Sequence, residues 1–122
     1  MPQTSILSVG IDHELLPLRN RVLRELGGYA VREQSDLSQV LSVLMDGDFD
    51  LVILCHSIPP KERQGLAIAT KAAKPSTLVL AVGLNGEATA GADGYVHSPD
   101  GPDSLLRCVD ELLSGQLQSG AA

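Results

Sequence analysis

Phe49-Asp50-Leu51-Val52-Ile53-Leu54 ends in four consecutive large apolar residues. A run of this kind predicts a strand that is covered on both faces, as the strands of parallel sheets are. Residues 78–82, Leu-Val-Leu-Ala-Val, form a second fully apolar run of the same type. Two such runs in one short chain indicate an α/β protein with helices on both faces of a parallel sheet.

The rest of the chain alternates between short apolar runs and amphipathic stretches. Three more strands are predicted at residues 6–9, 29–31 and 95–96, the second of them at a sheet edge. Helices are predicted from Leu15 to the Gly27-Gly28 pair, from a cap at Ser35 or Asp36, over residues 66–74, and over residues 103–113. Two apolar stripes with helical spacing are expected to face the sheet: Leu15, Leu18, Val22 and Leu26 in the first helix, and Leu37, Val40, Leu41 and Leu44 in the second.

This alternation predicts where a functional site lies. The loops that follow parallel strands meet at the carboxyl edge of the sheet. We therefore expect any site among the loops after Val9, Leu54, Val82 and Val96.

Length and composition limit the classes of protein. The chain has 122 residues, which predicts one domain over residues 1–115 and a flexible tail over residues 116–122. Nine basic and fifteen acidic side chains give a net charge of −6, which argues against nucleic acid or an anionic membrane as a partner. With no export signal, no apolar run that could span a bilayer and two cysteines only, we expect a cytoplasmic domain with free thiols.

Several segments, in their order and spacing, resemble the receiver domain of two-component response regulators over residues 6–113. They are Ile6–Val9, Arg24–Tyr29, Phe49–Leu54, Ile58-Pro59 with Gly65, and Gly91–Val96 with Pro99. The resemblance implies a flavodoxin-like α/β fold, with a doubly wound five-stranded sheet of order 2-1-3-4-5. It also implies transfer of a phosphoryl group from a kinase histidine to an Asp after the third strand. Mg²⁺ held by that Asp and an acidic pair, a Ser or Thr, and a Lys would support the transfer.

The residues at those five positions are of other kinds. The acidic pair falls on Gly10 and Ile11, the phosphoacceptor on Cys55, the Ser or Thr on Gly83, and the Lys on Ser98. Neither glycine, isoleucine nor a thiol supplies the oxygen ligands that Mg²⁺ prefers, and Asp12 alone does not make the site. We therefore expect a degenerate receiver, or pseudo-receiver, that is not an enzyme, needs no cofactor and does not accept phosphate by the family's route.

A second departure concerns shape. Residues 84–90, Leu-Asn-Gly-Glu-Ala-Thr-Ala, hold an Asn-Gly turn signal where receivers have a full fourth helix, so this helix is predicted to be shortened or missing. Tyr95 falls where receivers often carry a switch aromatic. With Gly83 at the position of the Ser or Thr that the switch couples to, a packing role is favoured over a switch or partner-binding role.

The histidines and Cys55 offer two further hypotheses. His13, His56 and His97 all follow strands, and with Cys55 and Asp12 they suggest a zinc site. Because they form no local ligand motif, scattered loop histidines are the favoured interpretation. Cys55 as a redox-sensing thiol would need a nearby positive charge; no Lys or Arg flanks it in sequence, which favours a buried, inert thiol.

The function predicted from these residues is that of a stand-alone pseudo-receiver in bacterial signalling. It would act by phosphorylation-independent contact with a partner protein, with a homodimer left open. The alternative is a sensor of a small molecule or metal that uses the remodelled pocket at the carboxyl edge. A small enzyme has the least support, because no set of catalytic residues is visible.

Overall fold

The fold is seen in a computed structural model that describes residues 4–12, 15–83, 89–97 and 101–114. The strands among these residues are β1 (Ser5–Val9), β2 (Ala30–Gln34), β3 (Leu51–Leu54), β4 (Leu78–Gly83) and β5 (Gly94–His97). The helices are α1 (Leu15–Glu25), α2 (Val40–Asp46), α3 (Pro60–Ala73) and α4 (Pro102–Ser114), with a 3-10 turn, η1 (Leu37–Gln39), before α2.

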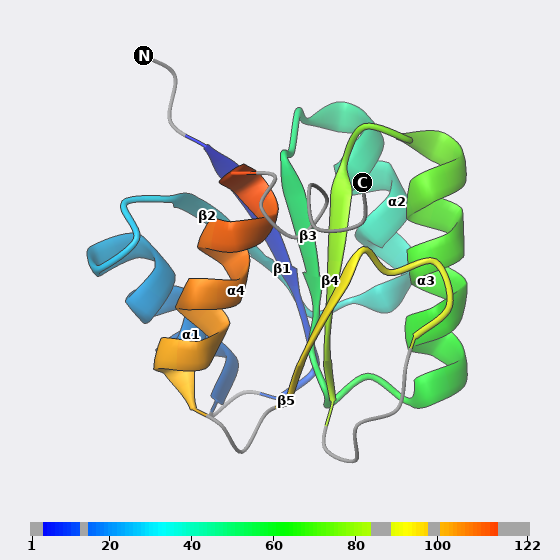
Figure 1. Cartoon of the computed structure of the whole chain (residues 1–122). Helices are drawn as coiled ribbons and strands as arrows, with labels where there is room; N and C mark the ends of the chain where they lie inside the picture. The colour runs from blue at the N-terminus through cyan, green and yellow to red at the C-terminus, as the bar shows by residue number, and fades with distance from the viewer. Residues whose placement is uncertain (1–3, 13–14, 84–88, 98–100, 115–122) are drawn as a thin grey trace, which may run out of the picture.

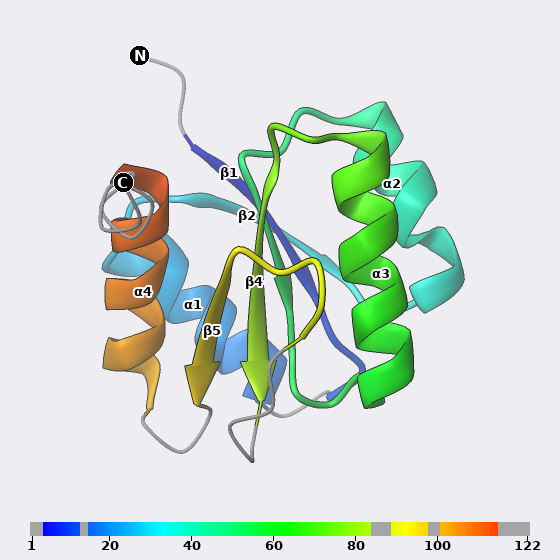
Figure 2. The ribbon, with the colours of Figure 1, turned by 45° about the vertical axis from the view of Figure 1, so that its right-hand side comes forward.

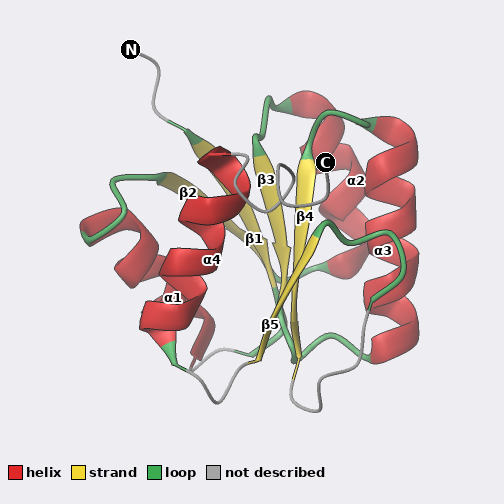
Figure 3. Cartoon of the chain, viewed as in Figure 1, coloured by secondary structure: helices red, strands yellow, loops and turns green. Residues whose placement is uncertain are grey.

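The five strands form one parallel sheet in the order β2-β1-β3-β4-β5. Helices α1 and α4 cover one face of the sheet and α2 and α3 cover the other, so the molecule has three layers (Figures 1 and 3). The arrowheads of β4 and β5 point to the same end of the sheet (Figure 2). The predicted flavodoxin-like doubly wound fold is confirmed, and with it a common carboxyl edge for all five strands.

Each face of the sheet has its own aliphatic core. Ile53 and Leu80 pack against Leu105 and Val109 on the side of α1 and α4. Leu54 packs with residues of α2 and α3 on the other side. No helix in the described part of the chain has the length and hydropathy needed to cross a membrane.

The predicted inward stripes of α1 and α2 are wrong in part. Leu18 and Leu26 are 58% and 69% exposed, and Leu16 and Leu23 are buried in their place. In α2, Leu41 is 40% exposed. Leucines in α1 occur at helical spacing on two sides, so spacing alone cannot say which side meets the sheet.

Helix α3 begins six residues before the predicted start at Leu66. Pro60 occupies its first turn, where a missing N–H costs nothing and the fixed φ of proline suits a helix. The early start places Arg63 inside the helix, on the same face as the buried residues Ala67 and Thr70. Strand β2 runs to Gln34, longer than predicted, and is confirmed as an edge strand with Arg32 and Glu33 exposed.

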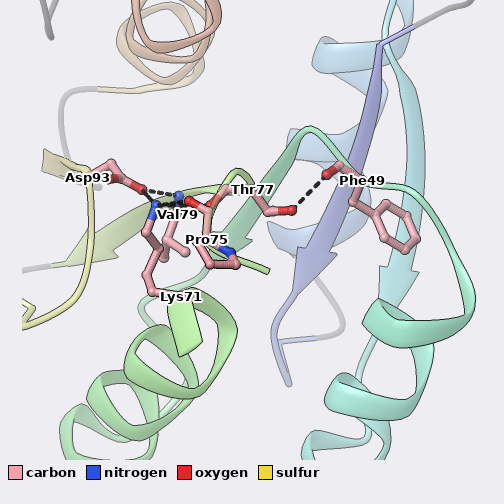
Figure 4. A network of polar contacts seen from close by, with 6 residues as sticks. All are labelled: Phe49, Lys71, Pro75, Thr77, Val79 and Asp93. Atoms are coloured by element: carbon pink, nitrogen blue, oxygen red, sulfur yellow. Dashed lines mark hydrogen bonds and ion pairs between the residues drawn. The ribbon is translucent and has the colours of Figure 1, made fainter. Parts of the chain in front are cut away.

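The connection between β4 and β5 carries the predicted change of shape. Its described residues, 89–93, form turns and no helix, in line with the predicted shortened or missing fourth helix; residues 84–88, on which most of that prediction falls, lie outside the described part. Asp93 ties this connection to the start of β4, because its Oδ2 accepts from the Val79 N–H at 2.8 Å. Lys71 Nζ donates to the same oxygen at 3.1 Å and to the carbonyls of Pro75 and Thr77, as Figure 4 shows.

On the opposite side of the sheet, Tyr29 joins the end of α1 to α4. Its hydroxyl donates a hydrogen bond to the carboxylate of Asp110. Burial raises the pKa of Tyr29, and the hydrogen bond and charge of Asp110 raise it further, so the phenol stays protonated as a donor.

Candidate functional site

The carboxyl edge of the sheet brings Gly10 and Cys55 side by side. Cys55 directly follows β3, and its N–H donates to the carbonyl of Val9 at 2.9 Å, which continues the pairing of β1 and β3. A Cβ atom on Gly10 would lie 3.0 Å from Cys55 Cβ and 3.2 Å from Ser57 Oγ. Position 10 therefore has no free space for a carboxylate unless Cys55 or Ser57 moves.

Ser57 holds the start of the loop after β1. Its Oγ accepts a hydrogen bond from the backbone N–H of Ile11 at 3.0 Å. The Ile11 side chain is 42% exposed, so it projects away from the core.

Cys55 is 1% exposed and lies on the face of the sheet covered by α1 and α4. Burial raises the pKa of its thiol, against the opposing charge of Arg19 and hydrogen bonds with the side chains of Arg19 and Ser8. The charge of Asp12 raises the pKa further. The thiol is therefore neutral near pH 7, as predicted for a buried, inert cysteine, although a positive charge does lie near it in space.

Arg63 reaches the same edge from the other layer. It is 5% exposed, and its Nη1 donates to the carbonyl of Val82 at 3.0 Å, one residue before the end of β4. Its charge, with that of Arg19, acts on His56, which directly follows Cys55. Burial lowers the pKa of His56 and the two arginines lower it further, whereas Asp12 raises it. Two arginines from two helices thus face this edge.

Sequence reasoning missed Arg19 and Arg63, although a signal was present. Arg19 is three residues after Leu16 and four before Leu23, two of the buried residues of α1. Arg63 is four residues before the buried Ala67. Charged side chains seldom lie at helical spacing from buried residues. An arginine at such a position is therefore a signal that its guanidinium interacts with other groups of the protein.

Tyr95 fills the space beside Gly83. A Cβ atom on Gly83 would lie 2.6 Å from the Tyr95 hydroxyl oxygen and 2.7 Å from its ring carbon Cε1. The ring is partly buried, which agrees with the predicted packing role. The absence of a side chain at position 83 makes room for the tyrosine.

Of the remaining predicted site residues, the structure describes His97 but not His13 or Ser98. His97 ends β5 and is paired in register with Gly83. His13 and Ser98 lie outside the described residues. Within residues 4–12, 15–83, 89–97 and 101–114, no three His, Cys, Asp or Glu side chains are grouped so that they could hold a metal ion.

The donor set also bears on Mg²⁺, which the receiver resemblance implies. Of the described residues at the positions after β1 and β3, Asp12 brings a carboxylate, while Gly10, Ile11 and Cys55 bring none. Mg²⁺ needs several oxygen ligands, and nearby arginine charge opposes its binding. These residues do not fit the ion.

Comparison with protein-family profiles and with curated proteins gives no match. Solved structures do match. A response regulator receiver domain protein (CheY-like) from Methanospirillum hungatei JF-1 superposes with a TM-score of 0.83 at 24% identity, over 97% of this chain and 99% of that one. A putative response regulator from Chloroflexus aurantiacus J-10-fl superposes with a TM-score of 0.80 at 21% sequence identity. The match covers 93% of this chain and 99% of that one.

A third match is DrrB from Thermotoga maritima, an OmpR/PhoB homologue, with a TM-score of 0.80 at 24% identity. The match covers 94% of this chain and 54% of DrrB. At these identities the likeness establishes the fold. The chain has the fold of response regulator receiver domains, as the sequence resemblance implied.

Proposed function

We propose that this chain is a pseudo-receiver, a signalling domain with the receiver fold that works through contact with a partner protein and without phosphorylation. The observation that carries the proposal is the packing of Cys55 against Gly10. The resemblance places the phosphoacceptor at Cys55, a 1% exposed thiol, and any side chain at Gly10 would press against it, because an added Cβ would lie 3.0 Å from Cys55 Cβ.

The charge at this edge supports the same proposal. Transfer of a phosphoryl group in receivers depends on Mg²⁺ to neutralise the phosphoryl oxygens. Among the described residues, the charges of Arg19 and Arg63 act on His56 against that of Asp12. Two guanidinium charges near this edge oppose the binding of a metal cation.

The test is incubation with Mg²⁺ and a small phosphodonor, followed by measurement of intact mass. We expect no gain, while a receiver that accepts phosphoryl groups is modified in parallel. The variant Cys55→Asp supplies an acceptor carboxylate alone and should also stay unmodified, because Gly10 and Ile11 hold no metal. A gain of one phosphoryl group by the wild-type chain, at Cys55 or elsewhere, would refute phosphate independence.

The partner is proposed to be a protein of the same signalling pathway or a second copy of this chain. Sedimentation equilibrium separates the two cases. A mass that rises toward twice the monomer with concentration supports the homodimer, and a constant monomer mass supports a different protein.

A sensor of a small molecule is the second candidate. The observation that favours it is the presence of buried polar nitrogen atoms without partners at the carboxyl edge.

A further inference from the structure

Two buried nitrogen atoms at the carboxyl edge lack hydrogen-bond partners in the described structure. They are Nε of Arg63 and Nδ1 of His56. Arg63 is 5% exposed and is fixed by the bond from its Nη1 to the Val82 carbonyl, so its Nε cannot turn to bulk water. A buried donor without a partner costs about 1–3 kcal/mol, and more for a charged group, unless something else accepts from it.

Among the described residues, two positive charges and one negative charge act on His56. Arg63 belongs to α3 on one face of the sheet and Arg19 to α1 on the other. Both act on His56, and the opposing charge comes from Asp12. A guanidinium with most of its surface buried is stable when a negative group lies beside it. Within the described residues, the buried Arg63 forms no ion pair with a carboxylate.

We infer that this edge binds a small oxyanion, a phosphate or carboxylate group, directly and without a metal. Its oxygen atoms would accept from Arg63 Nε and from the His56 imidazole, while Arg19 contributes charge from the opposite layer. Charge-assisted bonds from a guanidinium suit such a ligand, since the donor fork matches the spacing of the oxygens. A metal cation would meet repulsion at the same place.

This inference deepens the second candidate function, a small-molecule sensor, and does not depend on the pseudo-receiver proposal. A non-covalent oxyanion site is compatible with an active or an inactive phosphoacceptor. The experiment uses inorganic phosphate without Mg²⁺, which transfers no phosphoryl group. Its outcome is therefore separate from that of the phosphodonor test.

The experiment is a titration of the ¹⁵N-labelled chain with sodium phosphate, and in a second arm with sodium acetate, against sodium chloride at equal ionic strength. We expect saturable shifts at the amides of Cys55, His56 and Ser57 and of Val82, with a dissociation constant of about 1 mM or below for the better ligand. Whichever arm saturates at the lower concentration identifies the group as phosphate or carboxylate.

Two variants and one matched control test the assignment. Arg63→Met keeps the length of the side chain and removes its charge, and we expect binding to weaken by about tenfold or more. His56→Gln, at a partly exposed position, gives a second variant should Arg63→Met not fold. Arg107→Gln makes the same charge change on the exposed face of α4 and should leave binding unchanged.

Shifts that only follow ionic strength, or that occur away from these four amides, would overturn the inference. Equal weakening by Arg107→Gln would do the same, because it would show a general effect of net charge. Retained binding in both Arg63→Met and His56→Gln would exclude these side chains as the ligands.

Discussion

Tyr95 and Gly83 are matched in shape, because the tyrosine ring occupies the space that any side chain at position 83 would need. We expect Gly83→Ala to displace the ring and to lower the free energy of unfolding by about 1–3 kcal/mol, as overpacking usually does. Urea denaturation measures this loss. Nitration of Tyr95 should also become faster, since the ring is pushed outward.

The variant Tyr95→Ala provides the control for this pair. In that background Gly83→Ala should lower the free energy of unfolding much less, since the ring that the new methyl group would displace is absent. An equal cost in both backgrounds would show that the alanine is unfavourable for another reason, such as a change in the strand itself.

Cys55 is expected to be unreactive in the native state. Burial raises the pKa of its thiol, and the nucleophile is the thiolate. Cys108 is half-buried, and its pKa is also raised, first by burial and then by the charge of Glu111. A chromogenic disulfide reagent at neutral pH should therefore label the variant Cys108→Ser only at the rate at which the protein unfolds. Fast labelling of Cys55 would contradict the buried position.

His56 predicts a pH dependence of stability. Its pKa in the folded state is lowered, so the unfolded chain binds the proton more readily. Stability is full above the ordinary imidazole value of 6.5 and is lost as the pH falls from there through the lower folded-state pKa. Urea unfolding in phosphate-free buffer between about pH 8 and about pH 5 measures this effect.

The matched variants for this titration are His56→Gln and His97→Gln. His56→Gln should lose less stability at low pH than the wild-type chain does. His97→Gln should lose as much as the wild-type chain. An unchanged pH profile in His56→Gln would assign the proton uptake to other groups.

The connection between β4 and β5 is held by one carboxylate. Asp93 Oδ2 accepts from the buried Val79 and from Lys71, and the Asp93 N–H donates to the Val79 carbonyl at 2.7 Å. Asp93→Ala should lower the free energy of unfolding by about 1–3 kcal/mol, because it leaves the N–H of Val79 without its acceptor. Asp93→Asn keeps an oxygen acceptor and should cost less. Thermal denaturation of both variants tests this order, and equal losses would assign the effect to charge alone.

The elements differ in how well they could be predicted. Strands β3 and β4 are continuous apolar runs, so their identity and burial follow directly from sequence. Helix α1 was predicted at the right place but with an inward stripe that is wrong in part, because apolar residues occur on two sides of it. The start of α3 was predicted too late, because the Pro59-Pro60 pair was interpreted as a loop, although the second proline is well placed in a first helical turn.

For the whole molecule, the order of the strands in the sheet could be predicted from the sequence. The residues that make up the candidate site could be predicted only in part. The absence of carboxylates at Gly10 and Cys55 is visible in sequence, since each position follows a predicted strand. The approach of Arg19 and Arg63 is not, because it depends on the rotation of α1 and the start of α3. On both of these features the sequence prediction was wrong.

The exposed strand β2 has a consequence for assembly. A free sheet edge is a template for pairing with another chain, and charged side chains on it discourage such growth. Arg32 and Glu33 place opposite charges on this border, so continuous extension of the sheet from one molecule into the next is disfavoured there. Any symmetric pair of these chains that forms beside β2 would then be joined by helical surfaces, and the sheet would remain five strands wide.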